Sequence, residues 1–268
     1  MAKKERVDTL LVEQGLVETR EKAKRTIMAG LVYAEDERID KPGMKIDNAT
    51  PLHLKGELLP YVSRGGLKLQ KALDVFPFTV EGRTVLDIGA STGGFTDCAL
   101  QHGAKHVYAV DVGYNQLAWK LRTDERVTVM ERVNFRYVTA DQFEGKLPEV
   151  AVCDVSFISL RLILTPLTKL LPKGGDVCVL IKPQFEAGRE EVGKKGIVRD
   201  PVIHKKVVTG VIRFAEELGY QIQGLDISPI TGTEGNKEFL LHAKWDGAMP
   251  EVLFPPEKIE TVISSSLN

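Results

Sequence analysis

Apolar residues recur along this chain with two different spacings. From residue 84 onward, short uninterrupted apolar runs, which are typical of buried strands, alternate with runs in which an apolar residue returns every three or four positions, which is typical of helices. This alternation predicts the α/β class of fold, in which helices cover a parallel sheet. The predicted strands cover residues 85–88, 106–112, 127–130, 150–155, 176–181, 221–227 and 239–243. One predicted helix begins at residue 95, and the others cover 115–121, 160–171 and 201–218.

The first 55 residues or so follow a different pattern. Two short amphipathic helices are predicted there, followed by short strands at 31–34 and 51–54. Thr19 is the predicted N-cap of the second helix, and Gly30 is predicted to end it. Glycine and proline then interrupt residues 56–66, and a helix predicted at 67–76 leads into the sheet.

These breaks divide the chain into four predicted segments. A small α+β domain occupies residues 1–60, and a linker with its leading helix occupies 61–82. The sheet domain follows at 83–247. Residues 248–268 are polar and contain several prolines, so they are expected to form either a tail or an edge helix.

The turn after the first strand of the sheet is rich in glycine. Strand, glycine-rich turn and helix form the opening unit of many nucleotide-binding α/β sheets. The glycines at 89, 93 and 94 do not follow the Gly-x-Gly-x-x-Gly spacing of dinucleotide enzymes. Asp87, at the end of the strand, is expected to face the same crevice. A carboxylate there suits a ligand with a positive centre, and S-adenosylmethionine, with its sulfonium and amino groups, meets that description. The glycines alone would fit an ordinary strand-to-helix turn equally well.

Further polar residues stand at predicted strand ends, where open α/β sheets bind their ligands. Asp111 lies about twenty residues past the glycine turn, where an acid can bind a ribose hydroxyl. Asn134 follows the third strand and is a candidate adenine contact. Asp154 and Lys182 lie at the ends of the fourth and fifth strands. Glu238 precedes the last strand and would reach the same edge if that strand runs antiparallel.

Lys68, in the first turn of the leading helix, is a fourth ionisable candidate beside Asp154, Lys182 and Glu238. Each of the four could instead form an ordinary surface ion pair, which contributes little to stability. A lysine beside carboxylates at a buried strand end is, however, an unusual place for a solvated cation. The sequence therefore favours a polar site built from all four.

Composition narrows the classes of protein that fit. Among 268 residues, 43% are hydrophobic and 27% are charged, with a net charge of −1, so any nucleic-acid site must be local. No apolar run has the length needed to span a bilayer, and residues 1–5 lack the apolar core of a secretory signal, so we expect a cytoplasmic protein without a membrane partner. The cysteines at 98, 153 and 178 lie in apolar segments without metal-ligand spacing, which predicts buried free thiols and no metal site.

The first domain resembles a known module. Its matching residues are Arg6-Val7-Asp8, Leu11, Gly15-Leu16, Arg20, Ala23, Ile27 and Gly30-Leu31-Val32. They resemble the S-four RNA-binding domain, also called the alpha-L motif, in which two helices and a small sheet present basic residues to structured RNA. The phosphate contacts that this resemblance implies are Arg6, Arg20, Lys22, Lys24 and Arg25. Such binding would be local and sensitive to salt.

Five further segments extend the resemblance over almost the whole chain. They are SRGGLKL at 63–69, VLDIGASTGGFTD at 85–97, CDVSFISL at 153–160, IKPQFE at 181–186 and GNKEF at 235–239. Together they resemble the TlyA family, also called the hemolysin A family, of ribosomal RNA 2′-O-methyltransferases, whose catalytic domain is similar to FtsJ-type methyltransferases. The resemblance implies a Rossmann-like, S-adenosylmethionine-dependent methyltransferase sheet behind a small N-terminal RNA-binding domain.

The family resemblance also implies roles for particular residues. Its Lys-Asp-Lys-Glu tetrad falls on Lys68, Asp154, Lys182 and Glu238. For transfer to a ribose hydroxyl we expect Lys182 either to accept or steer the proton or only to align the hydroxyl, Asp154 and Glu238 to orient Lys182, and Lys68 to neutralise or hold a nearby phosphate. The cofactor positions fall on Asp87, Gly89, Ala90, Ser91, Gly93, Asp111 and Asn134. Further candidate RNA contacts are Arg64, Lys194 and Lys195. The implied substrate is a cytidine ribose in large-subunit and, in some members, small-subunit ribosomal RNA, either free or in ribosomal subunits.

Four other functions compete with this interpretation. The chain could be a non-catalytic RNA-binding assembly factor, although the intact tetrad argues against it. A membrane-lytic role, which the hemolysin name suggests, has no support in the sequence, because its hydrophobic pattern predicts neither a spanning helix nor a strongly amphipathic lytic segment. A base-nitrogen methylase would be expected to carry Asn-Pro-Pro-aromatic after the fourth strand, where this chain has Asp154-Val155-Ser156-Phe157. A cytosine-carbon methylase needs a nucleophilic cysteine, and Cys153 is expected to point into the core instead.

Overall fold

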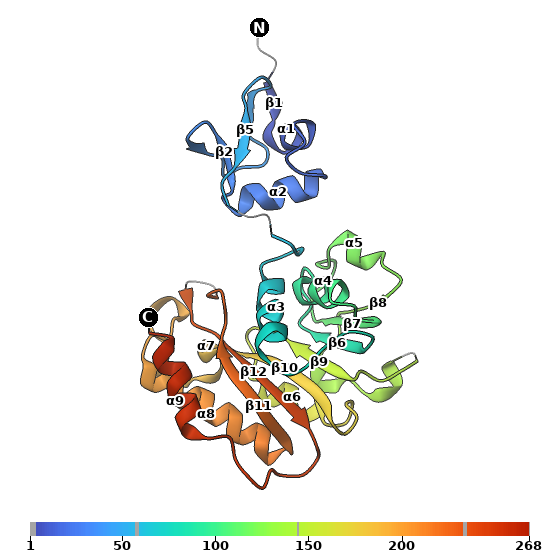
Figure 1. Ribbon diagram of the computed structural model, residues 1–268, viewed down its shortest axis with the longest axis vertical. Coiled ribbons are helices and arrows are strands. Elements are labelled where there is room, and N and C mark those ends of the chain that lie inside the picture. The colour runs from blue at the N-terminus through green and yellow to red at the C-terminus, as the bar shows by residue number, and fades with distance from the viewer. Residues whose placement is uncertain (1–3, 57–58, 144, 233–234, 268) are drawn as a thin grey trace. The chain divides into compact units, whose positions relative to one another are not determined.

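The computed structural model describes residues 4–56, 59–143, 145–232 and 235–267 (Figure 1). The chain divides into two compact units, Met1–Pro60 and Tyr61–Asn268. The segment expected to form a linker and leading helix, residues 61–82, is therefore part of the second unit.

The first unit contains two short helices and two small sheets. Its elements are β1 (Lys4–Arg6), α1 (Val7–Glu13), α2 (Arg20–Met28), β2 (Val32–Ala34), β3 (Glu37–Arg38), β4 (Lys45–Asp47) and β5 (Leu52–Leu54). β1 pairs with β4, and β2 lies between β3 and β5. The apolar faces of α1 and α2 meet in a single core that includes Leu10, Leu11, Ala23 and Ile27.

Both predicted helices of this unit are confirmed. The Thr19 hydroxyl accepts a hydrogen bond from the backbone N–H of Lys22 at 3.2 Å, and Gly30 has a φ of 74° just past α2. The strands predicted at 31–34 and 51–54 correspond to β2 and β5. The sequence does not predict β1, β3 and β4, because these two or three residues are mostly charged and form no apolar run, unlike those of β2 and β5.

The second unit is built on one seven-stranded sheet, in the order β11-β12-β10-β9-β6-β7-β8. The strands are β6 (Thr84–Ile88), β7 (His106–Asp111), β8 (Val127–Glu131), β9 (Val150–Cys153), β10 (Gly175–Ile181), β11 (Tyr220–Ile227) and β12 (Phe239–Trp245). β6 to β10 pair in parallel, whereas β12 runs antiparallel to both of its neighbours. The predicted α/β class is confirmed.

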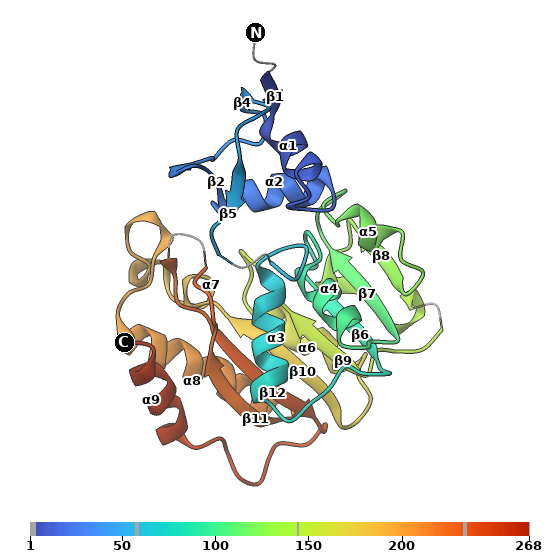
Figure 2. The same ribbon diagram turned by 45° about the horizontal axis from the view of Figure 1, so that its top comes forward.

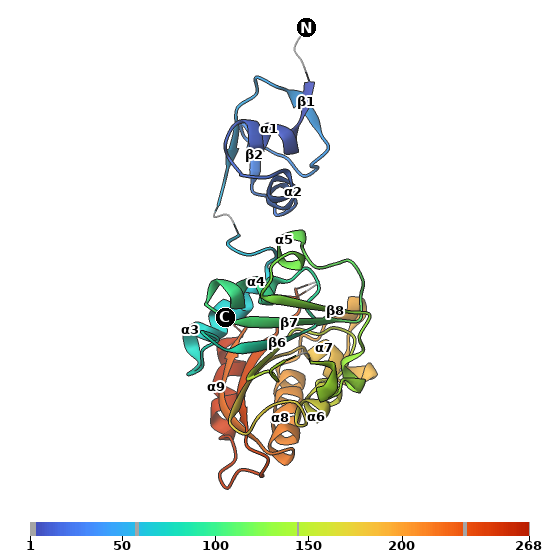
Figure 3. The ribbon, with the colours of Figure 1, turned by 90° about the vertical axis from the view of Figure 1, so that its right-hand side faces the viewer.

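Helices cover both faces of this sheet (Figures 2 and 3). α3 (Gly65–Val75) and α4 (Gly94–Gln101) lie on one face, and α6 (Arg161–Leu167) and α8 (Pro201–Glu217) lie on the other. Successive strand residues alternate between the two cores: Val85 packs toward α3 and α4, and Leu86 packs toward α6 and α8. The short elements are α5 (Trp119–Arg122), η1 (Phe135–Tyr137), η2 (Ala140–Gln142), α7 (Pro183–Glu186), η3 (Arg189–Glu191) and η4 (Lys194–Gly196).

Two helices are shorter than the pattern predicts. Of the helix predicted at 115–121, only the end is helical as α5, because Asn115 adopts a left-handed backbone with a φ of 58°. The helix predicted at 160–171 ends at Leu167 in α6. Pro166 lies in its last turn and has no N–H to continue the helical hydrogen bonds.

The three cysteines are buried free thiols, as predicted. Cys153 lies in the core between the sheet and helices α6 and α8, whereas Cys178 and Cys98, which is part of α4, lie in the core on the other face of the sheet. Burial raises the pKa of all three thiols above their usual value. None of them is therefore a thiolate at neutral pH, which argues against a cysteine nucleophile.

The C-terminal segment contains a helix, α9 (Pro256–Ser265), which packs against α8 and β11 (Figure 1). Its buried side chains are Ile259 and Ile263. They belong to the same core as the inner face of α8, so this helix extends the fold rather than trailing from it.

We expect Ile259→Ala to lower the free energy of unfolding of the second unit by about 2–4 kcal/mol, because it leaves a cavity in that core. Ser264→Ala, on the exposed side of the same helix, is the matched control and should change little. Urea unfolding followed by tryptophan fluorescence measures this unit alone, since Trp119 and Trp245 both lie in it. Equal stabilities of the two variants would contradict the packing of α9.

Candidate active site

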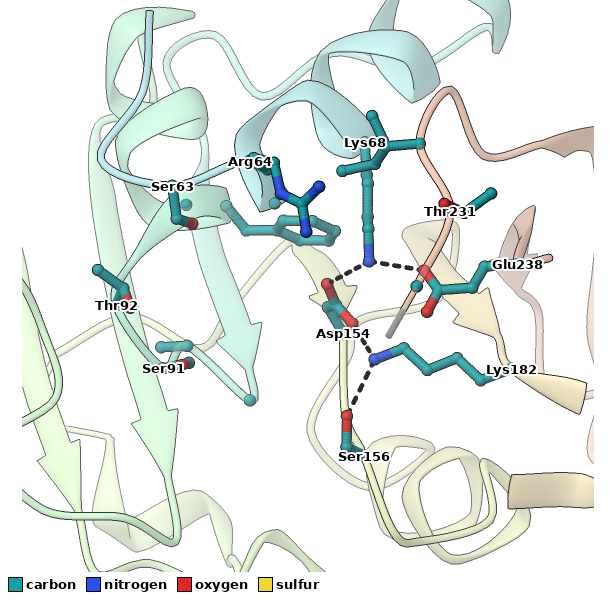
Figure 4. Close-up of a pocket in the computed structure, with 17 residues that line it drawn as sticks. Ser63, Arg64, Lys68, Ser91, Thr92, Asp154, Ser156, Lys182, Thr231 and Glu238 are labelled. Atoms are coloured by element: carbon teal, nitrogen blue, oxygen red, sulfur yellow. Dashed lines mark hydrogen bonds and ion pairs between the residues drawn. The ribbon is translucent and has the colours of Figure 1, made fainter. Parts of the chain in front are cut away.

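The structure brings Lys68, Asp154, Lys182 and Glu238 together at one edge of the sheet (Figure 4). Lys68 Nζ lies 3.1 Å from Asp154 Oδ2 and 2.6 Å from Glu238 Oε2. Lys182 Nζ lies 2.5 Å from Asp154 Oδ1. The four side chains thus form a line of alternating charge, in the order Lys182, Asp154, Lys68 and Glu238, which we call the charge row.

Strand topology explains why these residues meet. Asp154 directly follows β9 and Lys182 directly follows β10, and these two parallel strands end at the same edge. β12 runs in the opposite direction, and its first residue, Phe239, pairs with Ile181 at the end of β10. Glu238 therefore stands beside this edge, and the antiparallel last strand expected from the sequence is confirmed.

The charge row is almost closed to solvent. The exposed fraction is 9% for each lysine side chain, 18% for Asp154 and 3% for Glu238. Burial acts to lower the pKa of Lys68, but the carboxylates of Asp154 and Glu238 outweigh burial and raise that pKa. Burial acts to raise the pKa of Asp154, but the ammonium groups of Lys68 and Lys182 outweigh burial and lower it. The charged forms of Lys68 and Asp154 therefore depend on their oppositely charged partners.

Two contacts differ from the expectation. Glu238 was expected to orient Lys182, but it contacts Lys68 instead. The second partner of Lys182 is Ser156, whose hydroxyl accepts a hydrogen bond from Lys182 Nζ at 3.1 Å. Sequence reasoning missed Ser156 because a serine in the loop after a strand carries no signal of its own. Lys68, expected to hold a phosphate, is bound by two carboxylates.

Two cavities meet at this edge of the sheet. The first, of about 360 Å³, holds the charge row and is called here the charge-row cavity; its other walls include Ser63, Arg64, Gly65, Phe95, Thr231 and Gly232. The second, of about 620 Å³, is called the Asp111 cavity; its walls include Asp111, Gln116, Asn134, Phe135, Phe157 and Ile158. Gly89, Ser91, Asp154 and Ser156 line both. Asp154 therefore stands where the two cavities join.

The Asp111 cavity fits a nucleoside cofactor. Asp111 ends β7, and its two carboxylate oxygens accept hydrogen bonds from the backbone N–H groups of Ser91 and Gly113, each at 2.7 Å. These bonds fix the carboxylate where an acid binds the ribose in Rossmann-like sheets. Asn134 lies in the wall, and its side chain accepts a hydrogen bond from the backbone of Arg136. The volume falls within the range of small-ligand sites.

The glycine turn brings protein segments close together. Gly89 has a φ of 84°, and a Cβ there would lie 2.8 Å from the carbonyl oxygen of the loop after β9. Ala90 and Ser91 follow in the wall of the charge-row cavity, and Ser91 has a φ of 48°, which is uncommon for serine. Gly93 lines neither cavity; a Cβ there would overlap the side chain of Leu121. Its lack of a side chain thus serves the packing of α5.

Asp87 also lines neither cavity. Its side chain is fully buried in β6, where one oxygen accepts a hydrogen bond from the Thr96 hydroxyl at 2.6 Å and Oδ1 has no hydrogen-bond partner among the described residues. Burial raises the pKa of Asp87 to about 7. The carboxyl group therefore sits behind the glycine turn, joined to the first turns of α4.

The candidate RNA contacts fall on both units. In the first unit, Arg6 and Arg20 pair with Asp8, and Lys22 pairs with Glu18. Lys24 is exposed on the same helix, and Arg25 is half-buried. In the second unit, the exposed Arg64 lines the charge-row cavity, while Lys194 and Lys195 lie exposed in η4.

An exposed aromatic side chain stands beside the charge row. Phe157 is 90% exposed, lines the Asp111 cavity and has a φ of 63°, which is rare for a bulky residue. Its ring lies 4.9 Å from that of Phe185 in α7. The sequence places Phe157 in a matched segment but gives no sign of its exposure, because hydrophobic residues are ordinarily assigned to the core.

Glu186, at the end of α7, joins the loop that follows β9 to the segment that follows β10. Its carboxylate accepts hydrogen bonds from the Ser159 hydroxyl at 2.7 Å and from the backbone N–H of Leu160 at 2.6 Å. Burial raises the pKa of Glu186. The loop after β9 is thus held at its start by Lys182, which contacts Asp154 and Ser156, and at its end by Glu186.

Comparison with known protein families gives two matches. The FtsJ-like methyltransferase family matches residues 61–245, and the S4 domain matches residues 5–48. The first match spans the sheet and all four members of the charge row. The second spans most of the first unit.

Individual relatives match over nearly their full length. YqxC of Bacillus subtilis, provisionally named an rRNA methyltransferase, is 62% identical over 99% of this chain and 95% of its own. TlyA of Mycobacterium tuberculosis, named a 16S/23S rRNA (cytidine-2′-O)-methyltransferase, is 43% identical over 90% of each chain. A solved structure from Streptococcus thermophilus, provisionally titled a hemolysin, is 57% identical, with a TM-score of 0.78 over 100% of this chain and 97% of that one.

We expect Asp87→Asn to change how stability depends on pH. The pKa of Asp87 is raised from 3.8 to about 7, so between these values the folded state holds a proton that the unfolded state has lost. This contribution to stability is present at low pH and is lost as pH rises toward 7. The asparagine variant should therefore gain on the wild type between about pH 5 and about pH 8, by at most about 1.4 kcal/mol for each pKa unit of the shift.

Urea unfolding of the cofactor-free protein at the two pH values measures this gain. Val85→Ala, which shortens a buried apolar side chain of the same strand and touches no titrating group that the test depends on, is the control and should lower stability about equally at both pH values. A constant difference between Asp87→Asn and wild type would show that Asp87 does not titrate in this range.

Proposed function

We propose that this chain, which belongs to the TlyA family of FtsJ-like methyltransferases, transfers a methyl group from S-adenosylmethionine to the 2′-hydroxyl of a cytidine in ribosomal RNA. The observation that carries the proposal is the charge row at the junction of two cavities. One cavity fits the cofactor, and the other opens beside Lys182 for the ribose.

The family, the methyltransferase class and S-adenosylmethionine as cofactor agree with the sequence-based predictions and are confirmed. An S4 domain together with relatives named as rRNA methyltransferases indicates ribosomal RNA or the ribosome as substrate. Cytidine as the target and the cytoplasm as the location of the protein remain part of the proposal. Among the described residues, no group of acidic, histidine or cysteine side chains could hold a metal ion.

The chain's own residues perform the remaining tasks of the reaction. S-adenosylmethionine, when bound, supplies a methyl group on a positively charged sulfur; the carbon–sulfur bond breaks as the carbon–oxygen bond forms. Lys182 holds the attacking hydroxyl oxygen, since Asp154 and Ser156 fix two directions of its ammonium group and a third donor remains to be shared. Because the ammonium group of Lys182 has no free electron pair, the proton of the hydroxyl passes to the carboxylate of Asp154.

Lys68 and Glu238 act one step further from the reacting atoms. Lys68 binds the second oxygen of Asp154, and Glu238 binds Lys68, so both hold the Asp154 carboxylate in one orientation. Positioning of this kind contributes much of the rate of a reaction whose leaving group is already good. Arg64 lines the wall of the same cavity, and its proposed role is to bind the RNA backbone.

Phe157 is proposed to stack on a base of the RNA. An exposed ring beside the charge row, held in a left-handed backbone, offers the flat surface on which unpaired bases are recognised. The strain of that backbone is consistent with a functional position.

The alternative functions have less support. A non-catalytic assembly factor would have no use for a buried charge row at a cofactor-sized cavity. As for the hemolysin name that some relatives carry, the part of the chain that the structure describes contains no helix with the length and apolar character to cross a membrane.

We expect Lys182→Ala to lower the rate of methyl transfer at least a hundredfold while S-adenosylmethionine binding is retained, because the change removes the group that holds the hydroxyl. Transfer of labelled methyl to purified ribosomal subunits from cells that lack this protein measures the rate, and calorimetry measures cofactor binding. Lys173→Ala, an exposed lysine paired with Asp246, is the matched control and should be as active as wild type. Near-normal transfer by Lys182→Ala would refute the assignment.

We expect Glu186→Leu to lower kcat about tenfold or more, because the loop that carries Asp154, Ser156 and Phe157 loses its tie to α7. Glu186→Gln should keep most of the activity, since its amide can still accept from the backbone N–H and donate to the serine hydroxyl. Single-turnover methyl transfer at saturating cofactor measures both variants. Equal losses in the two would show that the charge of Glu186, rather than its hydrogen bonds, matters.

A further inference from the structure

The first unit contains a carboxylate with no solvent-accessible surface. Asp8, in the first turn of α1, is fully buried because two guanidinium groups cover it. These arginines are themselves partly exposed, so Asp8 lies just beneath the surface. Arg6 binds it through two parallel hydrogen bonds, Nε to Oδ1 and Nη2 to Oδ2, each at 2.9 Å. Arg20 binds the same Oδ2 through Nη2 at 3.2 Å. The hydrogen bonds from Arg6 lower the pKa of Asp8 to about 2.

The two arginines come from different elements. Arg6 ends β1, whereas Arg20 is the first residue of α2. A cation at the N-terminus of a helix is opposed by the helix dipole, so Arg20 gains nothing from its own helix. The guanidinium of Arg6 also lies against the backbone of Gly43, where a Cβ would approach it to 3.3 Å. Asp8 is thus the common anchor that holds both guanidinium groups side by side.

The outer surfaces of both arginines remain available. The exposed fraction is 40% for the Arg6 side chain and 54% for that of Arg20. A guanidinium carries five N–H donors, and Arg6 uses two of them on Asp8 while Arg20 uses one. The donors that are not used on Asp8 can bind a second anion, and guanidinium groups bind phosphate through two parallel hydrogen bonds.

We propose that Asp8 is a positioning residue for RNA binding: it orders Arg6 and Arg20 into a two-armed clamp for the phosphate backbone of ribosomal RNA. The inference rests on the proposed function, because it assumes an RNA substrate. Holding two long side chains in place before binding removes the entropy cost of ordering them at binding. Asp8 therefore strengthens RNA binding although its own charge repels RNA.

A positioning role for Asp8 predicts a change in RNA affinity opposite in direction to the change expected if Asp8 only balances charge. If Asp8 only neutralised nearby arginines, then removing its charge would tighten RNA binding and steepen its dependence on salt. If Asp8 positions them, the same change weakens binding. Asp40 provides a matched control, because it pairs with Arg38 in the same unit but is 59% exposed and covers no second arginine.

The test uses the full chain and an in vitro transcript of 23S rRNA as the probe, with filter binding over a range of salt concentrations. We expect Asp8→Asn to bind about tenfold more weakly than wild type, and Asp40→Asn to bind equally or more tightly. In methyl transfer to the same RNA, the loss in Asp8→Asn should fall on KM rather than on kcat. Equal or tighter binding by a folded Asp8→Asn would overturn the inference.

Asp8→Asn could also unfold the first unit, so a second variant is needed. Arg6→Lys keeps the positive charge and the Asp8 carboxylate but loses the two-point pairing. It should weaken binding about as much as Asp8→Asn, and wild-type affinity in this variant would also overturn the inference. Circular dichroism and NMR spectra report whether each variant is folded. If wild type fails to methylate ribosomal RNA at all, the proposed function fails; if wild type methylates and neither variant weakens binding, only the role of Asp8 fails.

Discussion

The arrangement of the active edge depends on one carboxylate shared between two lysines. Asp154 binds Lys68 through one oxygen and Lys182 through the other, and all three are nearly closed to solvent. Buried charges are costly unless each has a partner, so none of the three can be removed without leaving an uncompensated charge. Glu238 completes the balance by neutralising Lys68. The same contacts therefore fix the positions of these side chains and neutralise their charges.

The sheet supplies the geometry that this constraint needs. Parallel β9 and β10 place Asp154 and Lys182 at one edge, and the reversed β12 brings Glu238 to that edge from a distant part of the sequence. Two cavities open at this edge, and Asp154 and Ser156 lie in the walls of both. A methyl donor in one cavity and a ribose in the other would meet beside Lys182.

The sequence predicts the grouping of these residues but not their contacts. Strand ends can be read from apolar runs, and with the family resemblance they place Lys68, Asp154, Lys182 and Glu238 at one edge. Which lysine Glu238 binds depends on side-chain direction, which periodicity does not encode. For the same reason the pattern cannot separate Gly93, whose bare Cα admits Leu121, from a glycine that faces a ligand. The unpredicted strands of the first unit, β1, β3 and β4, consist mostly of charged residues, so their pairing is set by tertiary structure and leaves no apolar pattern in the sequence.

The central claim is that the shared carboxylate of Asp154 holds the group that acts on the RNA. Its most direct test is a map of 2′-O-methyl groups in ribosomal RNA from cells that lack this protein, complemented with wild type or with Asp154→Asn, which keeps the shape of the side chain but removes its charge. The account predicts that wild type restores at least one missing ribose methyl group and that Asp154→Asn, at equal abundance, restores none. Full restoration by Asp154→Asn, or a methylation map unchanged by loss of the protein, would contradict it.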